Sequence, residues 1–213
     1  MKHLVIWFLV LVLMPSFAPL QAKEEKKEKK QEKQEKKEQQ SSANSAVTTH
    51  TITIAGKPLT YEATAGTIAL KGNDGKEKAK VFYIAYVAKD VEDKSKRPLT
   101  FSFNGGPGSS SVWLHLGVFG PRRVVMNKDG SAPPPPARLT DNEFSILDKT
   151  DLVFIDPVTT GYSRAIPHEK AKNFHGVNQD IESVGDFLRL YTTRNRRWAS
   201  PKYIAGESYG TTR

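Results

Sequence analysis

The sequence predicts an α/β fold in which a parallel sheet follows an N-terminal antiparallel meander. Three observations predict it. Short β-rich stretches separated by turn residues come first, within residues 47–96. Apolar strands near residues 99–103, 152–156 and 202–205 then alternate with helical patterns, which is typical of a buried parallel sheet. A glycine-rich loop and a G-x-S-x-G turn each follow one of those strands.

The first 46 residues are predicted to lie outside the folded domain. Residues 1–22 have the composition of a secretory signal peptide, with an apolar run of 11 residues and a small residue, Ala22, at the expected cleavage point. An uncleaved membrane anchor is the alternative, although a helix needs about 20 apolar residues to span a bilayer. Residues 23–46 are predicted to be a Lys-, Glu- and Gln-rich disordered tether, because they offer no apolar face for packing.

Charge and cysteine content limit the classes of function. The formal charge is +9, of which residues 47–213 carry +6 from 23 basic and 17 acidic residues. This charge is modest, and glutamates interspersed in the tether reduce its field, so we expect no nucleic-acid partner. The absence of cysteine excludes disulfides and thiolate metal sites. An exported protein without disulfides suits a bacterial envelope, so we expect a secreted or periplasmic protein with no membrane contact after signal removal.

Three stretches with strand propensity predict the meander: residues 51–54, 59–62 and 81–87. Turn-forming segments at residues 56–58 and 72–75 separate them. Consecutive strands joined by such turns pair antiparallel, so we expect one meander here.

Strands and helices alternate after the meander. Residues 99–103 form a strand pattern, and the apolar strand 152–156 ends in Asp156. A helix is predicted from about Ser110, and residues 202–205 are a strand that leads into the G-x-S-x-G turn. A second helix is predicted from apolar residues that recur on one helical face, with acidic residues in its first turn. That face consists of Val177, Ile181, Val184, Leu188 and Tyr191.

The candidate chemistry lies in two of the loops. Residues 206–210, GESYG, match the G-x-S-x-G turn, which presents a serine nucleophile between a strand and a helix. This pattern is common by chance, but the loop at residues 104–108, NGGPG, follows an earlier strand and supports it. In this architecture the N–H after the nucleophile and an N–H from such a loop stabilise the oxyanion of a tetrahedral intermediate. Glycines let that backbone approach the substrate.

The glycine loop has two other interpretations, a tight structural turn and a phosphate-binding loop. It lacks the lysine of G-x-x-x-x-G-K-[ST], and Ser111 stands where G-x-G-x-x-G requires its last glycine. No nucleotide or other cofactor is therefore expected. The spacing of His, Asp and Glu suggests no metal site.

Four segments, FNGGPGSSS, LVFIDPVTTGYSR, DIESVGDFLRLY and AGESYG, resemble those of the serine carboxypeptidase family in order and spacing. Members of that family are α/β-hydrolases that remove C-terminal residues from peptides. The chain looks most similar to the bacterial branch, strongly over residues 97–213 and faintly over 47–96. The resemblance implies an α/β-hydrolase sheet, of which this chain covers about the first half and which is truncated at the nucleophile elbow.

The resemblance also implies catalytic roles. Ser208 would be the nucleophile, and the backbone N–H groups of Gly106 and Tyr209 would form the oxyanion hole. Asn104, the Gly105 backbone and Glu207 would bind the terminal carboxylate of the substrate. An anionic Glu207 would repel that carboxylate, so this role requires a protonated Glu207 whose pKa is raised by burial and a neighbouring acid.

Two positions depart from the family pattern. His115 stands where many eukaryotic members carry the acid that shares the proton with the glutamate. We expect that His115 and Glu207 form an imidazolium–carboxylate pair that makes carboxylate binding less dependent on low pH. The alternative is that His115 faces solvent or packs beside Trp113. Ser102 replaces a tryptophan that is frequent in relatives, which leaves one wall of the carboxylate pocket undefined.

The rest of a catalytic triad is missing from the chain. In this architecture the acid and the histidine follow the serine, whereas His50, His168 and His175 precede it. Asp156 precedes it too, and an aspartate before a proline more often caps a turn. We therefore expect an N-terminal fragment that is inactive and folds poorly, because its sheet would end at an unpaired apolar strand.

The sequence as a whole predicts an exported serine carboxypeptidase that removes C-terminal residues from peptides with a free carboxylate, through an acyl-enzyme. An esterase or acyltransferase on the same scaffold is the nearest alternative. A non-catalytic protein that only binds carboxylates is the alternative from another class. The oligomeric state is not predicted.

Overall fold

The computed structural model describes residues 45–213, so the predicted signal peptide and nearly all of the predicted tether lie outside the described residues. The first strand, β1 (Ser45–Ile54), begins two residues before the predicted domain boundary at residue 47. Ser45 and Ala46 pair with Gly66 and Ala65 of the next strand. These two residues therefore belong to the sheet and not to the tether.

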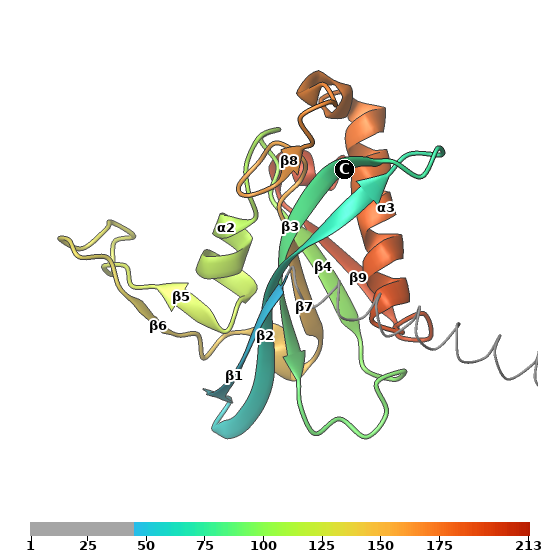
Figure 1. Ribbon diagram of the computed structural model, residues 1–213. Coiled ribbons are helices and arrows are strands. Elements are labelled where there is room, and N and C mark those ends of the chain that lie inside the picture. Colours follow the sequence, from blue (N-terminus) through green and yellow to red (C-terminus); the bar gives the residue numbers. More distant parts are fainter. Residues whose placement is uncertain (1–44) are drawn as a thin grey trace, which may run out of the picture. The chain divides into compact units, whose positions relative to one another are not determined.

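One seven-stranded sheet organises this part of the chain, with six strands in the order β1-β2-β3-β7-β4-β9 and β8 paired beside β3 (Figure 1). The first three strands are antiparallel, as the meander prediction requires. β7, β4 and β9 are parallel to one another. The remaining strands are β2 (Lys57–Lys71), β3 (Glu77–Ala88), β4 (Leu99–Phe103), β7 (Asp151–Ile155), β8 (Arg164–Ala165) and β9 (Lys202–Gly206).

Alternating side chains give the sheet two apolar faces. On β4, Leu99, Phe101 and Phe103 point to one face, which α3 (Val177–Arg194) covers through Phe187 and Tyr191. The opposite face packs against Leu114, which follows the glycine loop, and against Leu147, which precedes β7. Helical segments therefore cover both faces of the sheet (Figure 1), which is the arrangement expected of a buried parallel sheet.

The helix predicted from Ser110 is shorter and less regular than expected. It consists of one α-helical turn, α2 (Val112–Leu114), which continues as a π-helical turn, η1 (His115–Phe119). The Leu114 N–H donates to the side chain of Asn104 at 3.1 Å instead of to a carbonyl of a preceding turn. A helix cannot extend back through Ser110 when this donor is used elsewhere.

The helix α3 also differs from its predicted apolar face. Val184, Leu188 and Tyr191 pack in the core as predicted, together with Phe187. Val177 and Ile181 are 49% and 38% exposed, whereas Asp180 and Ser183 in the same turns are buried. Short 3₁₀ turns complete the helical segments: η2 (Ile146–Asp148), η3 (Ala171–Phe174) and η4 (Ser208–Thr211).

Two regions lie at the margins of the main sheet. β5 (Arg122–Val124) and β6 (Leu139–Asp141) form a separate antiparallel pair that projects away from it (Figure 1). β9 is the edge strand, and Tyr203 and Ile204 are exposed along it, so the predicted apolar edge is present. Among the helices of residues 45–213, none is long and apolar enough to cross a membrane.

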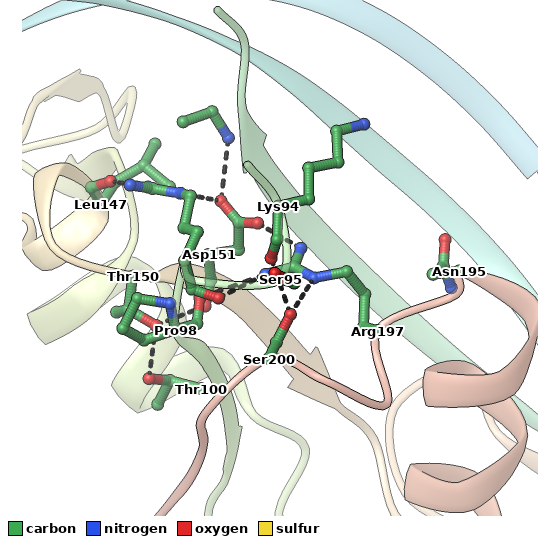
Figure 2. Close-up of polar contacts among 12 residues, drawn as sticks. Lys94, Ser95, Pro98, Thr100, Leu147, Thr150, Asp151, Asn195, Arg197 and Ser200 are labelled. Carbon is green, nitrogen blue, oxygen red and sulfur yellow. Dashed lines mark hydrogen bonds and ion pairs between the residues drawn. The ribbon is translucent and has the colours of Figure 1, made fainter. Parts of the chain in front are cut away.

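A buried ion cluster holds the amino ends of the parallel strands together (Figure 2). The Asp151 side chain is 1% exposed and accepts hydrogen bonds from Arg97 Nε at 2.6 Å and Arg197 Nη1 at 2.5 Å. It also accepts from the Ala88 N–H at 3.0 Å. Arg197 Nε donates to Ser200 Oγ, which in turn donates to the Lys94 carbonyl. Ion pairs and hydrogen bonds therefore connect the segments that enter β4, β7 and β9 at this end.

Candidate active site

The site forms at the carboxyl ends of the parallel strands, opposite the ion cluster. Phe103, the last residue of β4, is level with Gly206, the last residue of β9. The loops that follow both strands therefore begin side by side, at Asn104 and Glu207. This register brings together two motifs about 100 residues apart in the sequence.

The glycine loop packs directly on the serine turn. A methyl group placed on Gly105 would lie 2.4 Å from the Tyr209 nitrogen and 2.6 Å from the Gly210 nitrogen. These atoms belong to the backbone and cannot move aside cheaply. Only glycine therefore allows this contact between the two loops.

Ser208 occupies the strained backbone conformation expected of a nucleophile elbow. Its φ is +55°, in the left-handed region that non-glycine residues rarely adopt. The flanking glycines of G-x-S-x-G allow the turn to close, since a methyl group on Gly206 would lie 2.3 Å from the Gly210 carbonyl oxygen. The side chain of Ser208 is exposed, and within residues 45–213 its hydroxyl has no hydrogen-bond partner.

The two predicted oxyanion-hole donors lie on either side of this contact. Within the described part of the chain, neither the Gly106 N–H nor the Tyr209 N–H donates a hydrogen bond. Neighbouring amides are used in the turns, since the Ser109 N–H donates to the Gly105 carbonyl and the Gly210 N–H to the Glu207 carbonyl. The donors that the sequence singled out are thus available for a ligand.

Asn104 and Glu207 meet, as a shared carboxylate-binding role would require. Asn104 Nδ2 donates to Glu207 Oε2 at 3.2 Å. Asn104 is fully buried, and its Oδ1 accepts from the Leu114 N–H, which fixes the orientation of the amide. Glu207 is exposed, whereas the sequence-based role expected it to be buried beside an acid. The predicted burial of Glu207 is therefore not found in the described residues.

His115 does not pair with Glu207, and this expectation is wrong. Its Nε2 instead shares a 2.6 Å hydrogen bond with the Tyr86 hydroxyl, and the centre of its ring lies 4.6 Å from that of Phe154. Burial lowers the pKa of His115 to about 4, so the imidazole is neutral near pH 7. The residue is 8% exposed and neither faces solvent nor packs beside the exposed Trp113, so the alternative interpretation fails too.

Ser102 and Asp156 lie at the carboxyl ends of two neighbouring parallel strands, β4 and β7. Ser102 is fully buried, and its hydroxyl has no hydrogen-bond partner among the described residues. Asp156 accepts from the Ser111 N–H at 3.0 Å and the Tyr162 N–H at 3.2 Å, and burial raises the pKa of its carboxyl group. Asp156 therefore caps a turn and ties the segment after β7 to Ser111, which follows the glycine loop, and this matches the structural alternative for Asp156.

Arg213 and Asp180 are site neighbours that the sequence reasoning missed. The guanidinium of Arg213 donates to the Asp180 carboxylate from Nε at 3.0 Å and from Nη2 at 2.8 Å. Its Nη1 donates to the Asn104 carbonyl at 2.6 Å. The guanidinium also lies 5.2 Å from the centre of the Tyr209 ring and 5.6 Å from that of Phe103. In the sequence, Asp180 is recognisable only as an acidic residue in the first turn of a helix. No feature of the sequence indicates a role for Arg213.

The remaining histidines do not approach the serine. His50 bonds to Thr48, and His175 bonds to Thr159. No histidine within residues 45–213 forms a hydrogen bond with Ser208. The same part of the chain contains no cluster of three or more His, Asp or Glu side chains that could hold a metal ion.

Comparison with known proteins identifies the family. Residues 55–212 match the family described as serine carboxypeptidase. The chain therefore belongs to the serine carboxypeptidase family. A prohormone-processing carboxypeptidase from Saccharomyces cerevisiae has a crystal structure similar to this one, with a TM-score of 0.52 and 31% identity over 70% of this chain and 31% of that chain. This match and the sheet topology confirm the predicted α/β-hydrolase fold with N-terminal antiparallel strands.

Curated relatives agree on the family. The chain is 35% identical over 156 residues to the pheromone-processing carboxypeptidase KEX1 of Saccharomyces cerevisiae, which covers 68% of this chain and 20% of that protein. It is 30% identical over 136 residues to the serine carboxypeptidase ctsa-3.2 of Caenorhabditis elegans, which covers 62% of this chain and 24% of that protein. The chain thus spans about a fifth to a quarter of the length of these relatives.

Proposed function

We propose that this chain provides the nucleophile and the oxyanion-binding half of an exported serine carboxypeptidase. The observation that carries the proposal is the contact between the glycine loop and the serine turn. Gly105 abuts the Tyr209 nitrogen, Ser208 has a φ of +55°, and two N–H donors nearby have no partner in the described residues. A serine, two free donors and a site beside them for a carbonyl are the requirements of acyl transfer.

The proposed reaction proceeds through an acyl-enzyme. Ser208 Oγ attacks the carbonyl carbon of the last peptide bond, while the N–H groups of Gly106 and Tyr209 stabilise the negative charge that develops on the carbonyl oxygen. The C–N bond breaks, the C-terminal amino acid leaves with a proton on its amine, and water then hydrolyses the acyl-serine. The base that accepts the serine proton and its orienting acid come from the rest of the whole protein in this proposal.

Selectivity for a C-terminal residue is assigned to Asn104, the Gly105 backbone and Glu207. The contact between Asn104 Nδ2 and Glu207 Oε2 at 3.2 Å supports a joint role. A protonated Glu207 would donate a hydrogen bond to a substrate carboxylate, whereas an ionised Glu207 would repel it. Glu207 is exposed in the described residues, so its side chain is accessible to a substrate carboxylate.

The proposal is tested with the full-length protein and a pair of blocked dipeptides that differ only at the C-terminus. The peptide with a free carboxylate should be hydrolysed, and its C-terminal amide should react at least about 100-fold more slowly. The amide carries no negative charge, so the hydrogen-bond donors that would bind the carboxylate lack their anionic partner. Ser208→Ala should abolish this activity and labelling by a fluorophosphonate. Equal rates on both peptides, or a preference for small esters, would favour the esterase or acyltransferase instead. Binding of the dipeptide without turnover would favour a non-catalytic carboxylate-binding protein.

Export is the second part of the proposal, and it rests on the composition of residues 1–22. The mature protein should be recovered outside the cytoplasm, and its intact mass should correspond to a chain that begins after Ala22. Recovery of a cytoplasmic protein that retains residues 1–22 would contradict it.

A further inference from the structure

Arg213 connects three separate parts of the site. Its side chain is 1% exposed. The guanidinium donates to Asp180 in the first turns of α3, to the backbone carbonyl that opens the glycine loop, and it lies over the ring of Tyr209 in the serine turn. The two loops that carry the proposed oxyanion-hole donors are therefore attached to a single side chain.

We propose that Arg213 is a positioning residue that fixes the distance between the glycine loop and the serine turn. This inference rests on the proposed function, because the distance matters to catalysis only if the Gly106 and Tyr209 N–H groups bind the same oxyanion. Arg213 acts through the Asn104 carbonyl on one loop and through the Tyr209 ring on the other. It does not itself touch the substrate in this proposal.

The chemistry of arginine explains why this residue suits the task. A guanidinium is planar and carries five N–H donors in a fixed geometry, so it can bind a carboxylate with two nitrogens and a carbonyl with the third. It can also lie over an aromatic ring at the same time. Lysine has one nitrogen at the end of a flexible stem and cannot meet these three partners in one orientation.

Asp180 keeps the positive charge of Arg213 compensated. Its carboxylate receives three of the four hydrogen bonds that this guanidinium donates, at 2.8 to 3.0 Å. Arg213 therefore supplies rigid geometry more than a free positive charge near the substrate. Removal of Arg213 would leave the Asn104 carbonyl without this donor and the two loops without their common attachment.

The first test measures local order, which does not depend on activity. In the full-length protein, Arg213→Met and the milder Arg213→Lys should both raise amide hydrogen exchange in residues 104–110 and 207–212. Exchange in the β1–β2 hairpin should stay at the wild-type rate. Wild-type exchange in both loops of both variants would overturn the proposal.

The second test separates positioning from general stability. Both variants should lower kcat and the rate of Ser208 labelling by a fluorophosphonate by roughly 10- to 100-fold, since small misplacements of catalytic groups have effects of this size. The KM for a blocked dipeptide should stay within about twofold, because the lost interaction acts in the transition state. A rise in KM with unchanged kcat would overturn the proposal.

Two arginines provide matched controls. Arg189→Met removes an exposed arginine that pairs with Asp186 on the same helix as Asp180. Arg197→Met removes a buried arginine from the ion cluster at the other end of the sheet. Arg197→Met should destabilise the protein without slowing the labelling of correctly folded molecules. An equal loss of labelling in Arg197→Met and Arg213→Met would overturn the proposal. A wild-type protein that no fluorophosphonate labels would instead contradict the proposed function. In that case the hydrogen-exchange result alone would decide the role of Arg213.

Discussion

At position 105 the absence of a side chain allows the site to form. The Gly105 α-carbon faces the backbone nitrogens of Tyr209 and Gly210, and an added methyl group would lie 2.4 Å and 2.6 Å from them. Both nitrogens belong to the backbone of the serine turn. Any substitution must therefore push the glycine loop away from the serine.

We expect Gly105→Ala to slow fluorophosphonate labelling of Ser208 by roughly 100-fold or more, which is the cost of losing one oxyanion-hole donor. The free energy of unfolding should fall by about 1–3 kcal/mol, as for other overpacked substitutions. Labelling kinetics and chemical denaturation of the full-length protein measure both effects.

Gly185→Ala is the matched control for this substitution. Gly185 lies within α3, and a methyl group there would have no neighbour within 4 Å. The helix should gain up to about 1 kcal/mol, and labelling should be unchanged. Labelling of Gly105→Ala at the rate of Gly185→Ala would contradict the role of the glycine.

The site residues that the sequence predicted correctly are those that act through their backbone or belong to one of the two loop motifs. Asn104, Gly105, Ser208 and Tyr209 come together because both loops end parallel strands in the same register. His115 was placed wrongly, because a position in a motif does not reveal on which side of an irregular helical turn its side chain points. The Arg213–Asp180 pair was missed because partners 33 residues apart leave no periodic pattern.

Among the elements, the parallel strands depend on the ion cluster at their amino ends. Asp151 begins β7, Arg97 precedes β4 and Arg197 precedes β9. Loss of the carboxylate charge would leave two buried guanidinium groups without their counter-ion. Such changes to a buried pair are strongly destabilising.

We therefore expect Asp151→Asn to lower the free energy of unfolding by about 3–5 kcal/mol, measured by chemical denaturation of the full-length protein. Asp186→Asn, which removes one partner of the exposed pair with Arg189, should cost less than about 1 kcal/mol. Equal losses in the two variants would show that burial does not decide the importance of these pairs.

The elements themselves were predictable in type and order, but less so in length. The sequence predicted a strand over residues 59–62, whereas β2 spans 15 residues. Its second half continues through Gly66, which opposes Tyr83 of β3, so cross-strand pairing outweighs the low strand propensity of glycine. Likewise, α2 begins after the predicted Ser110 because Asn104 takes the Leu114 N–H, a contact that depends on the fold and not on local sequence.

For the whole molecule, His115 links stability to pH. Burial lowers the pKa of His115 to about 4, below the value of 6.5 that is usual for histidine and that applies to the unfolded chain. Between these two values the unfolded state binds a proton that the folded state does not. The contribution is fully present above pH 6.5, and it is lost as the pH falls to 4, for a total of about 3 kcal/mol.

We expect His115→Gln to flatten the fall in unfolding free energy between pH 6.5 and 4. Glutamine keeps a polar group beside the Tyr86 hydroxyl but does not titrate. Denaturation curves at several pH values measure the slope, and His175→Gln, at an exposed position, should follow the wild type. A wild-type slope in His115→Gln would mean that other groups cause the acid sensitivity.

The ion cluster and the site occupy opposite ends of the same three parallel strands. Substitutions that are well separated and share no partners combine additively in their effects on stability. Stabilising substitutions at the amino ends of the strands can thus offset destabilising substitutions at the site. Changes at the amino ends that strengthen the sheet would compensate for stability lost through substitutions in the two loops of the candidate site.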